Sequence, residues 1–248
     1  MSARRACTGL GGAIILLSVL GCSLDLRHFS QVSDSTGGSG NSASGGNSDV
    51  PRAGSGGAAS IEPLPTDCDY SKAARPECQS LVKNPGFAVD VAGWLTEPGP
   101  ITLTWKGKDA NDDANSGSLS LLNAFYGETD APIALGAYQC LPATPGVTYA
   151  MAGDVWIPKG QGDGADGGPY TASAGFSVIF KDDSACAGHT LSNFTSDLVS
   201  DSEVWTHLDA TGAAPQGTGS MDVRLVTLKN FREFQFEAWF DNVLVTTR

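Results

Sequence analysis

The side chains that could carry out catalysis are few and scattered along this chain. The histidines are His28, His189 and His207, and the sequence contains neither an HExxH motif nor a GxSxG nucleophile elbow. Two pairs of carboxylates, 112–113 and 182–183, are adjacent in the sequence. On a strand the two side chains of each pair would point to opposite faces, and in a turn they would be solvated. Glycoside hydrolysis needs two carboxylates about 5 to 9 Å apart across a cleft, an arrangement that sequence alone leaves open. We therefore predict a protein that is not an enzyme.

Cysteine is the other residue type with informative chemistry. Cys7 and Cys22 lie in or directly after an apolar N-terminal segment, and the rest of the chain contains Cys68, Cys78, Cys140 and Cys186. Four cysteines permit three pairings, and an even number in an exported chain indicates two disulfides. We expect Cys68–Cys78 and Cys140–Cys186. The absence of a CxxC spacing or a neighbouring histidine argues against zinc.

The N-terminus has the pattern of an export signal. Two arginines precede the apolar run 13–17, which is too short to span a bilayer, and small residues lead into Cys22. This arrangement resembles the lipobox of bacterial lipoproteins, in which the cysteine is acylated and becomes the mature N-terminus. We expect residues 1–21 to be removed and Cys22 to be lipidated. Ser23 favours the outer membrane of a bacterial envelope, and the alternative is an ordinary signal peptide in which Cys22 is incidental.

Residues 22–66 are expected to form a lipidated N-terminus followed by a flexible linker. The Gly- and Ser-rich stretch 33–60 has almost no large apolar residue to bury, so the entropy of ordering it is not offset. A Gly-rich coil of this length reaches about 30 Å, enough to hold a folded domain away from a headgroup layer.

Composition restricts the classes of partner and fold. The formal net charge is −12, from 15 basic and 27 acidic residues, and no cluster of Lys or Arg follows the leader, so a nucleic acid is not expected as a partner. High glycine (31 residues) with only 17% charged residues favours an all-β domain with long loops. We place a short disulfide-closed lead-in at 67–80 and one β-domain at 81–248.

Short β-type runs separated by Gly, Pro and Asp turns are typical of a β-sandwich. The expected strands are 81–87, 101–106, 118–123, 137–141, 148–157, 174–181, 204–210, 221–228 and 233–246. Apolar residues alternate with a period of two in four of these runs, and this alternation predicts one buried face for each. The predicted core is Tyr149, Met151, Val155, Ile157, Phe176, Val178, Phe180, Met221, Val223, Leu225, Phe234, Phe236 and Phe240.

Several motifs of the domain occur in a recognisable order. They are Asn84-Pro85-Gly86-Phe87 with Gly93-Trp94, Ser116-Gly117-Ser118-Leu119, Gln139-Cys140, Pro145-Gly146-Val147-Thr148-Tyr149, Trp205, Ala214-Pro215 and Phe240-Asp241-Asn242-Val243. This succession resembles jelly-roll carbohydrate-binding modules of the family 4/9 and 22 type, with a galactose-binding-like sandwich. The resemblance implies an all-β, two-sheet antiparallel jelly-roll β-sandwich without catalytic activity.

The same resemblance implies a structural Ca²⁺. Asp241 matches the carboxylate that the terminal strand of the family contributes, whereas the carboxylate at the start of the domain is replaced by Ala88. Ca²⁺ takes about six to eight oxygen ligands, so Asp90 or backbone carbonyls would have to substitute. The loop 160–168 lacks the repeated nonapeptide of a glycine- and aspartate-rich calcium site, and we interpret it as a hairpin loop.

A sugar site needs an aromatic ring beside amides or charges on a concave surface. The candidate ligand-binding residues are Tyr138, Gln139, His207, Trp156 and Trp239. We favour the first two because a Cys140–Cys186 disulfide would place them beside the strand 174–181. Packing is the competing interpretation for each aromatic side chain, and we expect Trp94, Trp105 and Trp205 to be structural or buried.

Two classes of function follow from these observations. The first is a lipid-anchored, non-catalytic protein of the bacterial cell envelope that binds a polysaccharide or other glycan. The second is a structural or adhesive envelope lipoprotein whose sandwich contacts a protein partner. The sequence does not separate them, because jelly rolls serve both purposes.

Overall fold

The computed structural model describes residues 79–127, 132–161, 171–230 and 235–248. The chain divides into two units, residues 1–56 and 57–248, and every described residue belongs to the second. Cys22 with its expected lipid, the expected linker, His28 and the expected Cys68–Cys78 disulfide therefore lie outside the described residues, and these expectations stay predictions. Among the described residues there is no helix with the length and hydrophobicity of a membrane span.

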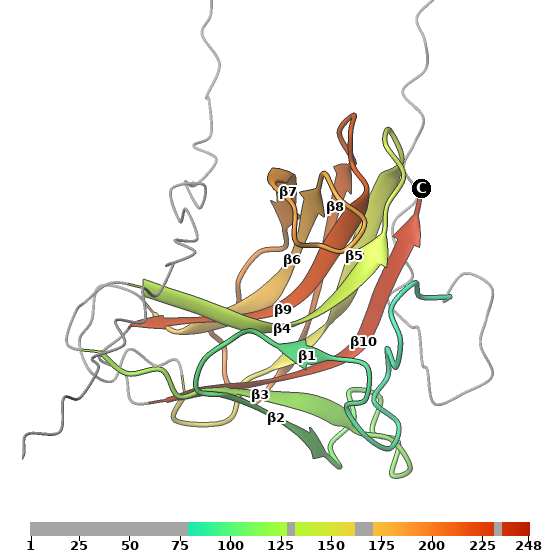
Figure 1. Ribbon diagram of the computed structural model, residues 1–248. Helices are drawn as coiled ribbons and strands as arrows, with labels where there is room; N and C mark the ends of the chain where they lie inside the picture. Colours follow the sequence, from blue (N-terminus) through green and yellow to red (C-terminus); the bar gives the residue numbers. More distant parts are fainter. Residues whose placement is uncertain (1–78, 128–131, 162–170, 231–234) are drawn as a thin grey trace, which may run out of the picture. The chain divides into compact units, whose positions relative to one another are not determined.

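The described part of the chain is built from β-strands arranged in two sheets (Figure 1). The strands are β1 (Leu95–Thr96), β2 (Ile101–Lys106), β3 (Ser118–Asn123), β4 (Pro132–Pro142), β5 (Thr148–Trp156), β6 (Ser173–Lys181), β7 (Thr190–Thr195), β8 (Trp205–Ala213), β9 (Ser220–Asn230) and β10 (Phe236–Thr247). The first sheet has the order β1-β4-β9-β6-β7, and the second has the order β2-β3-β10-β5-β8. All pairings between neighbouring strands are antiparallel.

The path of the chain between the sheets is that of a jelly roll. From β3 to β6 each strand lies in the opposite sheet from the one before it, and the same holds from β7 to β10. The two strands that end up in the middle of the sheets, β9 and β10, are therefore the last in the sequence. This arrangement confirms the predicted all-β, two-sheet antiparallel sandwich.

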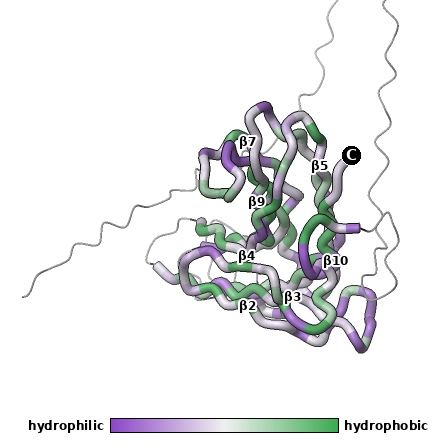
Figure 2. Tube along the Cα trace, turned by 45° about the vertical axis from the view of Figure 1, so that its right-hand side comes forward, coloured by the Kyte–Doolittle hydropathy of each residue, from purple (hydrophilic) through white to green (hydrophobic). Residues whose placement is uncertain are grey.

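The core lies between the two sheets and follows the alternation read from the sequence. The inward residues of β5, β6, β9 and β10 are almost completely buried, for example Met151, Val178, Leu225 and Phe240. Burial of each such side chain contributes about 1.5 to 3 kcal/mol, which opposes the entropy of ordering the long loops. Figure 2 shows hydrophobic residues along the strands and hydrophilic residues at several connecting loops. The predicted core is confirmed, except that Phe234 lies outside the described residues.

One predicted strand is absent and two short strands were not foreseen. Residues 81–87 form an irregular segment, because Asn84 and Phe87 adopt positive φ angles of 52° and 43° and Pro85 has no N–H to donate. The segment still follows β10, since Leu81 N donates to Val245 O (2.8 Å) and Val243 N donates to Pro85 O (2.8 Å). The strands β1 and β7 are too short or too polar to show a clear period.

The expected burial of Trp105 is wrong. Its side chain has the same parity as Ile101 and Leu103, but 42% of its surface is exposed because β2 is the edge strand of the second sheet. The indole Nε1 donates a hydrogen bond to Phe87 O (2.7 Å), which ties the edge strand to the irregular segment.

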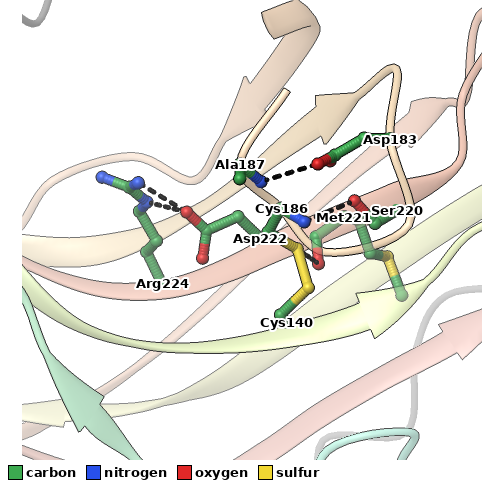
Figure 3. The surroundings of a disulfide bond; sticks show 8 residues. All are labelled: Cys140, Asp183, Cys186, Ala187, Ser220, Met221, Asp222 and Arg224. Carbon is green, nitrogen blue, oxygen red and sulfur yellow. Dashed lines mark hydrogen bonds and ion pairs between the residues drawn. A yellow bond between two sulfur atoms is a disulfide. The ribbon is translucent and has the colours of Figure 1, made fainter. Parts of the chain in front are cut away.

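The predicted Cys140–Cys186 disulfide is confirmed (Figure 3). It joins β4 to the loop between β6 and β7, with a Cα–Cα distance of 5.8 Å. Closing a loop of 46 residues contributes about 4 kcal/mol in the chain-entropy model. We expected this disulfide to place β4 directly beside β6, but β9 lies between these two strands. The bond therefore spans β9 and lies beside Asp222.

Candidate functional site

The outer face of the first sheet carries a row of side chains that crosses all of its strands. The register places one residue of each strand in this central row, in the order Leu95, Tyr138, Arg224, Ser177 and Thr195. They point away from the core because their sequence neighbours, such as Ala137, Val223 and Phe176, are buried between the sheets. Strands β4 and β9 are visibly bent in Figure 1, and the bend opens away from the second sheet.

Arg224, in the middle of the row, is held by two carboxylates. Its Nε donates to Asp222 Oδ2 (2.8 Å), its Nη2 donates to the same oxygen, and its Nη1 donates to Glu97 Oε1. Glu97 is placed by β1 and β4, since its Oε2 accepts the Gly136 N–H (2.8 Å). The three side chains expose only 17%, 5% and 14% of their surface for Arg224, Asp222 and Glu97. The guanidinium is therefore fixed at one position on the sheet.

The two carboxylates are partly removed from water. Burial raises the pKa of Glu97 and the pKa of Asp222 above their ordinary values, although the Arg224 charge acts in the opposite direction on both groups. For both carboxyl groups, burial therefore changes the pKa more than the Arg224 charge does. Hydrogen bonds made here are consequently stronger than on an exposed surface.

Hydrogen-bonding capacity is left over at the centre of the row. Asp222 Oδ1 is buried and has no hydrogen-bond partner. Arg224 has five N–H groups and directs three of them at the two carboxylates. An unsatisfied buried acceptor costs about 1 to 3 kcal/mol. Because Asp222 Oδ1 is fully buried, the hydrogen-bonding groups that a ligand on this face can reach are those of Arg224, whose side chain is 17% exposed. The geometry suits a polar, uncharged ligand.

The outer face of the second sheet carries a different row, which is rich in tryptophan. It consists of Trp205, Trp156, Trp239, Ser120 and Thr104. The rings of Trp156 and Trp239 are 4.3 Å apart between centroids, and Lys108 Nζ lies 4.0 Å from the Trp156 centroid. Neighbouring side chains therefore already cover Trp156, which exposes only 9% of its surface. A stacked sugar would need a free ring face, and Trp156 does not offer one, whereas Trp205, Trp239 and Tyr138 are partly exposed.

His207 and Gln139 have separate surroundings. His207 lies in the second sheet, where its Nδ1 pairs with Asp154 Oδ1 at 2.9 Å and this hydrogen bond raises the pKa of the imidazole. Gln139 is buried, and its amide accepts the Lys83 N–H (2.9 Å) and donates to Lys83 O (2.8 Å). Gln139 thus fastens the segment before β1 to β4.

The structure does not bring the five predicted ligand residues together. Tyr138 lies on the outer face of the first sheet, Gln139 points to the opposite side of the same strand, and the other three lie on the outer face of the second sheet. Sequence reasoning missed Arg224, Asp222 and Glu97. The signal for the first two was present, because both alternate with the buried Met221, Val223 and Leu225.

The two predicted calcium ligands have different surroundings. Asp241 is fully buried and accepts the Ala110 N–H at Oδ2 (2.9 Å), and burial raises the pKa of this carboxyl to about 8. Asp90 is exposed, and its Oδ1 accepts hydrogen bonds from Asn84 Nδ2 and from the Ala92 N–H. Within the described ranges, no group of three or more His, Cys, Asp or Glu side chains is arranged to hold a metal. Calcium binding stays a prediction.

No protein-family model matches the chain, and no curated protein matches it either. Among solved structures, it is similar to the enzymatically active domain of tailspike protein 4 of bacteriophage CBA120, with a TM-score of 0.50, 14% identity and coverage of 68% of this chain and 21% of that chain. It is also similar to the family 22 module and catalytic module of a Clostridium thermocellum xylanase complexed with xylohexaose (TM-score 0.47, 18% identity, 66% of this chain and 28% of that chain).

A third similar structure is a xylan-binding domain of family 22 from Paenibacillus barcinonensis, with a TM-score of 0.45, 14% identity and coverage of 65% of this chain and 90% of that chain. The chain spans about a fifth and about a quarter of the first two structures that it resembles. At these identities the comparisons describe the fold of the described domain, a jelly-roll sandwich, and extend no further.

Proposed function

We propose that this protein binds a neutral polysaccharide through the central row of the first sheet and does not cleave it. The observation that carries the proposal is Arg224, which two carboxylates hold at the centre of the row and which keeps two N–H groups that neither carboxylate accepts. The hydroxyl oxygens of a sugar can accept hydrogen bonds from these N–H groups. Two adjacent hydroxyls of a pyranose match the planar arrangement of N–H groups on one guanidinium.

The composition of the row supports a carbohydrate over a protein. Leu95, 58% exposed, and the half-buried Tyr138 offer apolar surface at one end, and the half-buried Thr195 offers a hydroxyl at the other. A pyranose has an apolar face and polar edges, and rings such as that of tyrosine stack on the former. With strands about 4.8 Å apart, a row across five strands is about 19 Å long, which accommodates several sugar units.

Charge favours a neutral glycan. The chain has a formal net charge of −12, and the cation of the row is already paired with two carboxylates. A polyanionic polysaccharide would be repelled by the overall field and would find no free cation in the row. We expect binding of uncharged polymers and little binding of uronate-rich or sulfated polymers.

The experiment is a glycan array probed with the chain from residue 23 onward, which omits the expected lipid attachment site Cys22. We expect retention of one or a few neutral polysaccharides and no release of reducing ends on incubation. If no glycan of any charge is retained, the proposal fails and the alternative of a structural or adhesive protein that contacts another protein is favoured. Preferential retention of polyanions would contradict the role assigned to the paired Arg224.

We further propose that Cys22 anchors the protein to a bacterial cell envelope, with the Gly- and Ser-rich segment as a spacer. Attachment through more than one acyl chain is stable, since each buried methylene contributes about 0.8 kcal/mol. Replacing Cys22 by serine should move the protein from the membrane fraction to the soluble fraction. A variant that remains membrane-bound to the same extent would contradict the anchor.

A further inference from the structure

The Cys140–Cys186 disulfide fastens the loop 182–189, which connects β6 and β7, across the outer face of the first sheet (Figure 3). Cys140 lies directly opposite Asp222 in the register of β4 and β9, and both side chains point outward. At the other end of the bond, the Cys186 N–H donates to Ser220 Oγ (3.1 Å). The loop therefore lies over β9, next to Asp222.

The part of β9 that the disulfide crosses is covered. Ser220 and Asp222 are only 0% and 3% exposed, although their side chains point to the outer face. Further along the same strand, Arg224 and Val226 point the same way and are partly exposed. Since the buried pair is the one that the disulfide crosses, the loop 182–189 keeps the Asp222 carboxylate out of water.

The loop is organised mainly by its own side chains. The Asp182 carboxylate accepts the His189 N–H (2.8 Å) and pairs with the His189 imidazole (3.1 Å), and Asp183 Oδ2 accepts the Ala187 N–H (3.2 Å). Among the described residues, Cys186 supplies the one N–H that this loop donates to β9. The disulfide is therefore the main link between the loop and the strand that it covers.

The covered state has unfavourable features that an open loop would relieve. Cys186 has a positive φ of 58°, in the left-handed region that residues with a side chain seldom adopt. Asp222 Oδ1 and, within the loop, Asp183 Oδ1 are buried without a hydrogen-bond partner. Once the loop moves away, water can reach both carboxylates and the Cys186 backbone can relax. These features favour the state without the disulfide.

We propose that the Cys140–Cys186 disulfide is a redox-sensitive switch, which a dithiol reductant opens in the folded protein and which exposes Asp222 when it opens. Cys140 is exposed, and exposed disulfides are more readily reduced than buried structural ones. The bond lies on the outer face of the first sheet, outside the core between the sheets, so the sandwich keeps its core when the bond is reduced.

Reduction proceeds by thiol–disulfide exchange. One thiolate of the reductant attacks Cys140 Sγ, and the bond breaks with Cys186 Sγ as the leaving group, which takes up a proton. The second thiol of the reductant then displaces Cys140, which is protonated in turn, and the reductant forms its own disulfide. Two electrons and two protons pass from the dithiol to the two cysteines.

The consequence for binding rests on the function proposed above. In the oxidised protein, the covered Asp222 holds the guanidinium of Arg224 at one position. A hydrated Asp222 forms weaker hydrogen bonds and leaves this guanidinium more mobile. We therefore expect reduction of the disulfide to weaken polysaccharide binding about tenfold.

The test is equilibration of the folded chain from residue 23 onward in mixtures of reduced and oxidised dithiothreitol. Alkylation and peptide mass spectrometry report the Cys140–Cys186 pair separately from Cys68 and Cys78, while tryptophan fluorescence reports whether the protein is folded. We expect the wild type to be reduced at Cys140–Cys186 before it unfolds. Affinity electrophoresis of the oxidised and reduced forms measures polysaccharide binding.

Two variants assign the effect to Asp222. Asp222→Asn keeps the shape of the side chain but removes the charge that the loop keeps dry, so the covered state becomes more favourable. It should be about tenfold harder to reduce, a shift of about 30 mV. Glu97→Gln is the matched control, because Glu97 holds the same guanidinium from the side of Gly136 and should leave the reduction midpoint unchanged.

Three results would overturn the inference whether or not a glycan binds. They are a Cys140–Cys186 bond that is reduced only after unfolding, an Asp222→Asn variant with the wild-type midpoint, and a Glu97→Gln variant shifted as far as Asp222→Asn. Equal affinity of the oxidised and reduced forms for a retained polysaccharide would contradict the switch. A protein that retains no glycan in either form contradicts the proposed function instead, and the reduction midpoints then decide the inference.

Discussion

Replacing Arg224 by alanine should weaken polysaccharide binding about 10- to 100-fold, the effect of losing hydrogen bonds to a charged group worth about 1.5 to 3 kcal/mol. The same change leaves Asp222 and Glu97 unpaired at a partly buried site, and it should lower the free energy of unfolding by about 2 to 3 kcal/mol. Affinity electrophoresis and urea denaturation measure the two effects separately.

The variant Tyr138→Ala separates binding from stability, because Tyr138 forms no part of the ion-pair network. It should bind about tenfold more weakly, since stacking of this kind contributes about 0.5 to 1.5 kcal/mol, and its melting temperature should change little. Trp239→Ala on the second sheet is the matched control and should bind like the wild type. If Trp239→Ala loses binding while Arg224→Ala retains it, the binding face is the tryptophan row and our assignment is wrong.

Truncating Phe240 should have the largest effect on stability. Its side chain is completely buried in β10 and packs edge-to-face against Phe176, with 5.7 Å between ring centroids. Phe240→Ala removes this contact and leaves a cavity, which typically costs about 3 to 5 kcal/mol. We expect a proportional fall in the urea midpoint, measured with the mature chain.

Two companion variants make that measurement specific. Val89→Ala, at a side chain that is 77% exposed, should change the free energy of unfolding by less than about 0.5 kcal/mol. Phe240→Leu fills most of the space and should fall between the wild type and the alanine variant. Equal stability of Phe240→Ala and Val89→Ala would show that the Phe240 side chain does not lie between the two sheets.

The parts of the fold that were predictable are the strands in which apolar residues occupy every second position. Met221, Val223 and Leu225 occupy every second position, and only one face of a strand in a sandwich can be buried, so their side is determined before any partner strand is known. The Cys140–Cys186 disulfide was predictable because four cysteines permit only three pairings. Trp105 shows the limit of this reasoning, because alternation does not reveal which strand lies at an edge.

The candidate site was not predictable in the same way. Tyr138, Arg224 and Ser177 become neighbours through the register of three strands, and register depends on pairings between distant segments. Glu97 follows a strand of only two residues that no periodicity could identify.

The position of β9 in the middle of the first sheet determines when the proposed binding row can form. Arg224, at the centre of the row, is the last member of the row to be synthesised, and its strand β9 is inserted between strands made much earlier. Such distant pairings are slow to form and arise only when nearly the whole sequence is present. If the row binds a glycan as proposed, the affinity is an all-or-none property of the completed domain, and we expect a chain shortened before residue 224 to retain none of it.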